Sequence, residues 1–337
     1  MSTVEFLSRP KSIQFWRVVV IAGVFWFTVT FIYLAKSNSR TDTSVQDAGQ
    51  GATATQKALS CSNAEYSQSA LEFSQLAELK YGNLTMDNFT IVMSTYDRPT
   101  AQNKALTALL NPIIPTLSEV VVIWNHIGKP TPGDFVSKHG VPVKYRASRV
   151  NSLNEKFRLD PDFPYRTRAI LLANDNVYYK PPDLEFAFHT WKTFGRNRVT
   201  GAISRCSNQN SRTGKWDYNL CEHKDEYSMV LTNLAFVDIS FMDYYSSDRD
   251  PRMPLVRDYI DDISNCEDIA MNFVTSMLTC EAPLLVKGKD NYESYDPGQV
   301  KSGHMETRSK CVNDFIEIFG GMALIKEHAR IELGPLA

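Results

Sequence analysis

Four short apolar runs, separated by segments with helical spacing, constrain the fold more than any other feature of this 337-residue chain. They are residues 89–95 (FTIVMST), 119–124 (EVVVIW), 142–147 (PVKYRA) and 169–173 (AILLA). Continuous apolar runs of this length are typical of mostly parallel strands buried on both faces. Helical patterns follow at 100–110 and at 183–194. The sequence therefore predicts an α/β fold with a doubly wound, Rossmann-like sheet, whose ligands bind beyond the carboxyl ends of the strands.

The second half of the chain has a different pattern. The expected elements are a polar loop at 204–226, one strand at 227–237, and helices at 254–262 and 267–278. Glu267 and Asp268 stand at the start of the last helix, where the helix dipole favours acidic side chains. That position alone would explain both acids without a catalytic role.

The N-terminal region is typical of a membrane anchor followed by a stem. Residues 18–35 are apolar and uncharged, near the lower length limit for a helix that spans a bilayer. The basic residues on either side favour, by a small margin, a cytoplasmic N-terminus. We predict a cytoplasmic tail (1–17), a transmembrane helix (18–35), a stem (36–87) and a globular domain (88–330). A looser helical pattern at 62–80 is expected to lead into that domain.

A cleaved signal peptide is the alternative for the same region, and it would leave a secreted, lectin-like protein. The apolar run is longer than the core of a usual signal peptide, and no small-x-small cleavage site follows it. Residues 36–60 are rich in Ser, Thr, Gln, Ala and Gly and contain no aromatic residue, which favours a flexible stem. The anchored arrangement is therefore preferred.

Charge and cysteine content agree with a protein of the secretory lumen. The net charge is −2 and the isoelectric point is about 6.3, so no basic field indicates a nucleic-acid partner. Six cysteines permit disulfides without forming a dense framework. Asn83 and Asn88 each begin an Asn-x-Thr glycosylation sequon, although Asn88 directly precedes a predicted strand.

Asn174-Asp175-Asn176 follows the fourth apolar run and is the first candidate site. Acidic side chains at the end of a central strand can hold a divalent cation against a diphosphate, because the cation offsets the charge of the leaving group. Oxygen ligands favour Mn²⁺ or Mg²⁺. Asn and Asp are also ordinary turn residues, so this segment alone is weak evidence.

Six further segments, in this order and spacing, resemble a known family. They are 94–98 (STYDR), 122–128 (VIWNHIG), 182–191 (PDLEFAFHTW), 227–232 (YSMVLT), 265–272 (NCEDIAMN) and 308–313 (RSKCVN). Over about residues 88–325 the chain resembles the C-terminal glycosyltransferase domain of exostosins and exostosin-like proteins.

The resemblance implies an A-type glycosyltransferase fold and the transfer of a sugar from a nucleotide diphosphate donor, with retention at the anomeric carbon. Animal members use UDP-N-acetylhexosamines and act on glycosaminoglycan chains or their linker, whereas related plant proteins act on glycolipids. It also implies a single-pass type II protein of the Golgi or endoplasmic reticulum membrane. Assembly with a second copy or with another transferase is possible in such a family.

The resemblance further implies roles for individual residues. Asp268 would lie beside the anomeric carbon, and Arg308 would offset the charge of the departing diphosphate. Cys266 and Cys311 would form a disulfide. The nucleotide-sugar site would comprise Arg98, Asn125, Asn151, Lys156, Asn174 and Asp175. Of these, Lys156 stands where the family has an arginine, so it keeps the charge but loses the bidentate geometry. On weaker grounds, Cys206 and Cys221 could pair across the polar loop.

The chain departs from the family at the acid cluster. Asn176 stands where the family has the acid that ligates the metal, and a neutral amide is a weaker ligand than a carboxylate. Asp175 could act as the sole carboxylate ligand, or Arg308 and Lys156 could reduce the need for a metal. The third reading is a catalytically weak relative that binds an active transferase. A second departure is Asn233-Leu234, where the family commonly has a small Gly-Ala pair.

Overall fold

The computed structural model describes residues 64–221, 226–290, 292–295 and 303–334. The predicted tail, the predicted transmembrane helix and the first part of the predicted stem lie outside these residues. Within the described ranges, no helix combines the length and the apolar character that a bilayer crossing requires.

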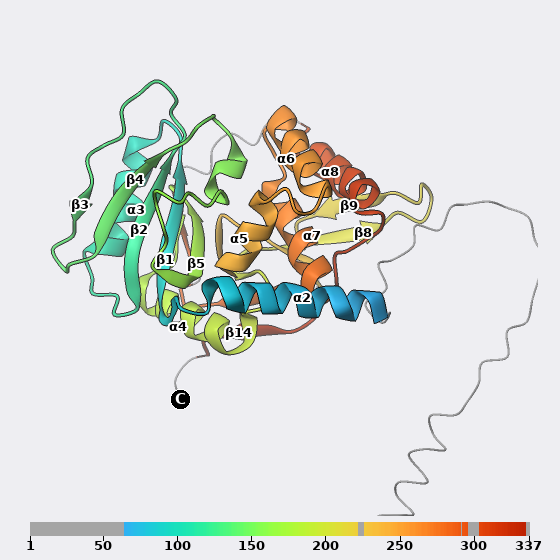
Figure 1. Cartoon of the computed structure of the whole chain (residues 1–337), viewed down its shortest axis with the longest axis horizontal. Coiled ribbons are helices and arrows are strands. Elements are labelled where there is room, and N and C mark those ends of the chain that lie inside the picture. The colour runs from blue at the N-terminus through green and yellow to red at the C-terminus, as the bar shows by residue number, and fades with distance from the viewer. Residues whose placement is uncertain (1–63, 222–225, 291, 296–302, 335–337) are drawn as a thin grey trace, which may run out of the picture. The chain divides into compact units, whose positions relative to one another are not determined.

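A mostly parallel sheet forms the centre of the described domain (Figure 1). Its nine described strands, in spatial order, are β14 (Arg330–Glu332), β12 (Leu284–Lys287), β7 (Thr200–Gly201), β11 (Leu234–Asp238), β5 (Thr167–Asn174), β1 (Thr85–Thr95), β2 (Leu117–Trp124), β4 (Pro142–Ala147) and β3 (Phe135–Val136). The four predicted runs correspond to β1, β2, β4 and β5, which pair with one another in parallel. Strand β11 is antiparallel to both of its neighbours. The predicted α/β fold with a mostly parallel central sheet is confirmed.

Helices cover both faces of this sheet. They are α2 (Ala64–Tyr81), α3 (Pro99–Leu110), α4 (Pro181–Thr190), α5 (Ile239–Ser246), α6 (Arg252–Ile263), α7 (Glu267–Thr279) and α8 (His304–Phe319). Two short turns, the 3-10 helix η1 (Leu153–Lys156) and the π-helical turn η2 (Trp191–Gly195), complete the described helical elements.

The alternation of side chains along the strands explains why the apolar runs are continuous. In β1, Val92 packs with residues of α5 to α8, whereas Ile91 and Met93 pack on the opposite face with residues of α3 and α4. Successive side chains of a strand point to opposite faces, so both sets of positions must be apolar when both faces are buried.

The region at 204–237 differs from its prediction. Residues expected to form a loop include the antiparallel strands β8 (Ser204–Gln209) and β9 (Trp216–Asn219), and the expected single strand is divided into β10 (Met229–Val230) and β11. The small sheet β10-β8-β9 lies against α8, whose Asn313 and Ser309 side chains accept hydrogen bonds from the backbone of β9. Polar contacts with α8 therefore act together with the burial of Cys206 and Tyr218 to position this hairpin.

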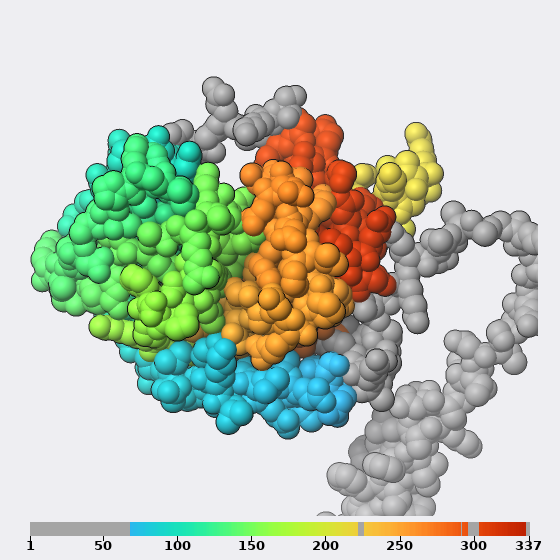
Figure 2. Space-filling view, turned by 45° about the horizontal axis from the view of Figure 1, so that its top comes forward, coloured from blue at the N-terminus to red at the C-terminus, as the bar shows by residue number. Residues whose placement is uncertain are grey.

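Helix α2 occupies part of the predicted stem and packs against the domain. Figure 2 shows it, in blue, lying along the orange segment that contains α5 to α7. The Phe73 and Phe241 rings stack with centroids 5.3 Å apart, and Lys80 forms an ion pair of 2.8 Å with Asp243. The residues directly before β1 thus belong to the folded unit.

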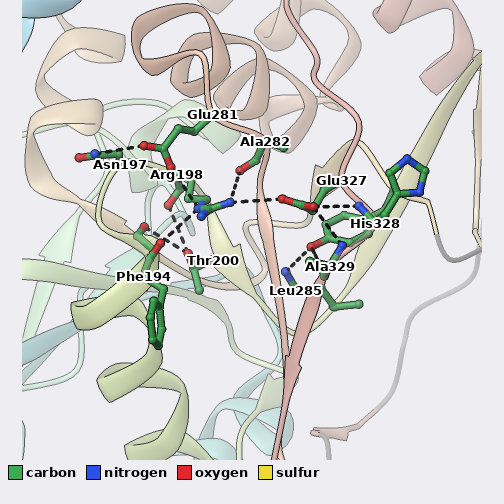
Figure 3. Close-up of polar contacts among 12 residues, drawn as sticks. Phe194, Asn197, Arg198, Thr200, Glu281, Ala282, Leu285, Glu327, His328 and Ala329 are labelled. Atoms are coloured by element: carbon green, nitrogen blue, oxygen red, sulfur yellow. Dashed lines mark hydrogen bonds and ion pairs between the residues drawn. The ribbon is translucent and has the colours of Figure 1, made fainter. Parts of the chain in front are cut away.

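Arg198 connects the end of the chain to the sheet (Figure 3). Its guanidinium donates to the carbonyl oxygen of Ala282 at 3.3 Å and pairs with Glu281 at 3.3 Å and Glu327 at 3.4 Å. The Tyr227 hydroxyl donates to the carbonyl oxygen of Ala329 at 2.7 Å. These contacts hold the segment that ends in β14 against the edge of the central sheet.

Candidate active site

Polar side chains gather in two clusters near the carboxyl ends of the parallel strands. The first cluster, formed by Thr95, Arg98 and Asp175, lies where β1 and β5 end. The second cluster, formed by Lys156, Glu267, Asp268 and Arg308, lies at the start of α7. Among the described residues, no hydrogen bond or ion pair directly joins the Arg98–Asp175 pair to the Asp268–Arg308 pair.

Asp175 is fully buried and is held by two side chains of the first cluster. Its Oδ1 lies 2.7 Å from Nη2 of Arg98, and its Oδ2 accepts a hydrogen bond of 2.8 Å from the Thr95 hydroxyl. Burial raises the pKa of Asp175, and the Thr95 hydrogen bond and the Arg98 charge lower it by less, so the net shift is upward.

The Asn174-Asp175-Asn176 segment fits a divalent cation poorly in this arrangement. Both oxygens of Asp175 already face Thr95 and Arg98, and Asn176 supplies a neutral amide in place of a carboxylate. Across the described ranges, no group of three or more His, Cys, Asp or Glu side chains lies close enough together to hold a metal ion. The binding of Mn²⁺ or Mg²⁺ stays a prediction.

Asp268 and Arg308 form a buried ion pair between α7 and α8. Nη2 of Arg308 donates to Asp268, and Nη1 donates to the Asn265 side-chain oxygen at 3.1 Å. The guanidinium also lies over the Tyr218 ring, 4.5 Å from its centroid. Asp268 and Arg308 are only 6% and 7% exposed, so the pair is largely withdrawn from solvent.

The electrostatics of this pair keep both groups charged. Burial by itself would raise the pKa of Asp268, but the charge and hydrogen bond of Arg308 and the charge of Lys156 lower it, and the net shift is downward. Burial by itself would lower the pKa of Arg308, but the charge and hydrogen bond of Asp268, together with the charges of Tyr218 and Glu267, outweigh burial, and the net shift is upward. Nε of Arg308 is buried and has no hydrogen-bond partner in the described structure. An unused donor on a buried guanidinium is suited to an anionic oxygen.

Lys156 and a disulfide complete the second cluster. Nζ of Lys156 lies 2.8 Å from Oε1 of Glu267, and the lysine side chain is 1% exposed. The predicted disulfide between Cys266 and Cys311 is present, with Cα atoms 6.4 Å apart, and it joins the residue before α7 to the middle of α8. Cys206 and Cys221 form the second predicted disulfide.

The remaining predicted residues lie on loops that follow the strands. Asn125, after β2, is buried and accepts a hydrogen bond from Ser148. Asn151 is exposed, and Asn174 is half-buried at the end of β5. The structure thus brings Lys156, Asp268 and Arg308 together and pairs Arg98 with Asp175. The ligand contacts of all these residues stay predictions.

Sequence reasoning gave no role to three residues that the structure places in these clusters or in contact with them. Asn265 stands within a segment already recognised, one residue before Cys266, and could have been found there. Thr95 ends an apolar strand, where a hydroxyl was a weak signal. Tyr218 lies in a region expected to be a loop, so no periodicity pointed to the guanidinium that it faces.

Comparisons with known proteins agree on one family. Residues 89–334 match the model of the glycosyl transferase family 64 domain. Human Exostosin-like 2 is 30% identical over 263 residues, covering 72% of this chain and 76% of the relative. Human Exostosin-2 is 32% identical over 252 residues, covering 71% of this chain and 33% of the relative. Glucosamine inositolphosphorylceramide transferase 1 of Arabidopsis thaliana is 30% identical over 246 residues, covering 70% of this chain and 31% of the relative. The chain therefore matches most of one relative and about a third of the other two.

Proposed function

Because this chain belongs to glycosyl transferase family 64 and to the exostosin-like proteins, we propose that it moves a sugar from a nucleotide diphosphate donor to a glycan or glycolipid. The donor is a UDP-N-acetylhexosamine, and the configuration at the anomeric carbon is retained. The enzyme works in the lumen of the Golgi or endoplasmic reticulum on an A-type domain anchored by residues 18–35. It acts there alone or together with another transferase.

The buried Asp268–Arg308 pair is the observation that supports this proposal most. In the transfer, the bond between the anomeric carbon and the diphosphate oxygen breaks, and a bond to the acceptor oxygen forms. The proton of the acceptor hydroxyl passes to the departing diphosphate. Arg308, with its unused Nε donor, can stabilise the negative charge on that leaving group. The Asp268 carboxylate, charged because its pKa is lowered, can stabilise the positive charge that develops on the sugar.

The nucleotide side of the site would draw on the first cluster and on η1. Arg98 is about one third exposed in its side chain, so it can turn from Asp175 toward a phosphate or a nucleoside. Lys156 lies close enough to Asp268 to lower the pKa of that carboxyl, so the lysine charge also acts at the reacting centre. We propose that these two cations, together with Arg308, provide most of the charge compensation that a metal held by the acid cluster would otherwise supply.

Donor hydrolysis and transfer by the full-length chain, produced in a secretory host, would test the proposal. A panel of UDP- and GDP-sugars is measured with Mn²⁺ and with EDTA. We expect turnover of one UDP-sugar, and a loss in kcat of about 100-fold or more in Asp268→Asn with UDP binding retained. Asp314→Asn, which removes the half-buried acid partner of the exposed Lys310 on α8, serves as the matched control.

A non-catalytic partner protein is the second candidate. It is favoured by the neutral Asn176 and by Asp175, whose two oxygens already face Arg98 and Thr95. Such a protein would bind UDP without turnover or would bind no nucleotide at all. Folded protein that turns over none of the sugars would contradict the enzyme proposal. Turnover that is equal in the wild type and in Asp268→Asn would contradict the role given to this carboxylate.

A further inference from the structure

Three polar residues form a row across neighbouring strands at the carboxyl edge of the parallel strands. Ser94 of β1 is the register partner of Asn174 of β5. The backbone N–H of Asn174 donates to the carbonyl oxygen of Asn233 at 2.9 Å, and Asn233 directly precedes β11. We call Ser94, Asn174 and Asn233 the polar row. All three residues are half-buried, so each is partly open to a ligand.

The polar row lies on the face of the sheet that α7 and α8 cover. Val92, Leu172 and Ala235 each stand two positions from one member of the row. All three pack in the core that also contains Ile269 of α7 and Val312 of α8. Because side chains two positions apart in a strand point to the same face, the row continues this face to the edge of the sheet. The Asp268–Arg308 pair belongs to the same two helices.

The segment between β10 and β11 connects the row to the first turn of α7. The side-chain oxygen of Asn272 accepts a hydrogen bond of 3.0 Å from the backbone N–H of Val230. The amide nitrogen of Asn272 donates to the carbonyl oxygens of Val230 and Asp268, both at 2.8 Å. Asn233 follows Val230 by three residues, which span at most about 11 Å. Asn233 therefore lies between the turn that carries Asp268 and the end of β5.

The side chains of the polar row are not engaged within the protein. In the ranges that the structure describes, none of the three forms a side-chain hydrogen bond. The Oδ1 atom of Asn233 is buried and has no partner there. A buried amide without a hydrogen bond costs stability, and an amide can both donate to a ligand and accept from it. Asn233 is therefore the member of the row best suited to bind a ligand group.

We propose that the polar row binds the sugar ring of the donor, and that Asn233 determines which sugar is accepted. The proposal rests on the transferase function. The row extends from β1, which leads to Arg98, to the segment bound to the turn of Asp268. A donor whose diphosphate reaches Arg98 and whose anomeric carbon lies at Asp268 would place its ring across the row.

The chemistry of the row suits an uncharged sugar. Its hydroxyl and amide groups donate and accept hydrogen bonds, as the hydroxyl and acetamido groups of a sugar do. The three side chains carry no positive charge that would hold a sugar carboxylate, and the Asp268 carboxylate nearby would repel one. A site that hydrogen-bonds one substituent discriminates strongly against a sugar that lacks it, because the polar group of the protein then stays unpaired.

Titration calorimetry with the full-length chain tests this assignment. The ligands are UDP, UDP-N-acetylglucosamine, its epimer UDP-N-acetylgalactosamine, UDP-glucose, which lacks the acetamido group, and the charged UDP-glucuronate. We expect the wild type to bind one uncharged UDP-sugar more tightly than the other sugars and than UDP. Asn233→Ala should reduce this preference at least tenfold and leave the affinity for UDP unchanged. Ser94→Ala should weaken the binding of the preferred UDP-sugar, again without an effect on UDP.

Two further variants complete the experiment. Asn197→Ala is the matched control, because Asn197 is exposed and donates to Glu281, beyond the opposite end of α7. It should leave all affinities unchanged. Asn233→Ser keeps a smaller hydrogen-bonding group and should show an intermediate preference, and it carries the test if Asn233→Ala does not fold. Circular dichroism verifies the fold of each variant.

Several results would overturn the proposal: a wild type that binds no UDP-sugar more tightly than UDP, the same preference in Asn233→Ala, or tightest binding of UDP-glucuronate. Equal loss of affinity for UDP and for UDP-sugars in Asn233→Ala would show that Asn233 is only structural. If UDP-sugars are turned over and the preference does not depend on Asn233, only the role of the polar row fails. If an Asn233-dependent preference is present without turnover of any donor, the transferase proposal fails and the sugar-binding role of the row stands.

Discussion

The two buried aspartates of the site have pKa shifts of opposite sign, although both are paired with an arginine. The guanidinium of Arg308 is itself buried beside Asp268, so its charge is poorly screened and lowers the pKa of the acid. Arg98 is partly exposed, so its attraction does not compensate for the burial of Asp175. The exposure of the paired arginine therefore determines whether the pKa of a buried aspartate is raised or lowered.

Asp175→Asn should change the pH dependence of stability. Because the folded-state pKa of Asp175 lies above its ordinary value of 3.8, the native state keeps this proton to higher pH than the unfolded state. The wild type therefore loses stability as pH rises through the interval between the two values, and the variant lacks that loss. Denaturant unfolding at about pH 3 and about pH 7 should show Asp175→Asn gaining relative to the wild type as pH rises. Asp262→Asn, on the exposed side of α6, should show no such gain, and a relative loss in Asp175→Asn would contradict the assignment.

The structural and the functional contributions of the Lys156–Glu267 ion pair can be measured separately. Glu267→Leu leaves a buried ammonium without its partner and should lower the free energy of unfolding by about 3–5 kcal/mol. The double variant Lys156→Met/Glu267→Leu should recover most of that loss, because both charges are removed together. Thermal unfolding measures both effects, and Asp314→Leu, which removes the half-buried partner of the exposed Lys310, should cost less than Glu267→Leu.

Donor binding by the stable double variant then reports on function. If Lys156 contacts the diphosphate, this variant should bind UDP more weakly than the wild type. Full UDP affinity in a folded double variant would show that the Lys156–Glu267 pair is only structural.

At the scale of elements, the Cys266–Cys311 disulfide determines how α7 and α8 present the Asp268–Arg308 pair. Its two cysteines are 45 residues apart, and closing a loop of that length stabilises a fold by about 4 kcal/mol. Cys266→Ser/Cys311→Ser should lose about this much stability and also lose turnover, because α7 and α8 are no longer tied beside the pair.

The second disulfide offers a matched control. Cys206 and Cys221 are 15 residues apart in the β8–β9 hairpin, so Cys206→Ser/Cys221→Ser should cost about 3 kcal/mol. Chemical denaturation and donor turnover are measured on both pairs of variants. Equal loss of turnover in the two would contradict a specific role for Cys266–Cys311 in presenting the site.

Elements buried on both faces could be predicted from the sequence, and elements held by polar contacts could not. Strands β1, β2 and β5 have continuous apolar runs because two cores require them, whereas the run of β4 is interrupted by Lys144 and Arg146. Strands β8 and β9 carry the polar runs SRCSNQ and WDYN, and their positions depend on side chains of α8 nearly 100 residues away. Within the site, a family motif led to Asp268 and Arg308, but no local pattern could have shown that Arg98 closes over Asp175.

For the whole molecule, the two glycosylation sequons report on the compartment in which the chain folds. Asn83 is exposed in the turn between α2 and β1, whereas Asn88 is half-buried within β1. Thr90 of the second sequon is fully buried and donates a hydrogen bond of 3.3 Å to Glu119. A glycan on Asn88 would prevent this packing, so folded molecules should carry a glycan on Asn83 alone.

Mass spectrometry of the full-length chain from a secretory host, before and after glycosidase treatment, measures this pattern. Asn83→Gln should remove the glycan, and Asn88→Gln should leave the mass of the glycan unchanged. Folded protein without any glycan would contradict the proposed lumenal orientation, and a glycan on Asn88 would contradict the packing of β1.

The Cys266–Cys311 disulfide also has a consequence for biosynthesis. At a translation rate of about 5–20 residues per second, Cys266 emerges about 2–9 s before its partner. During most of that interval its thiol is available to thiol–disulfide exchange catalysts, and Arg308, three residues before Cys311, has not yet emerged. The bridge can therefore close only after both members of the Asp268–Arg308 pair have emerged, so its oxidation comes late in the synthesis of the chain.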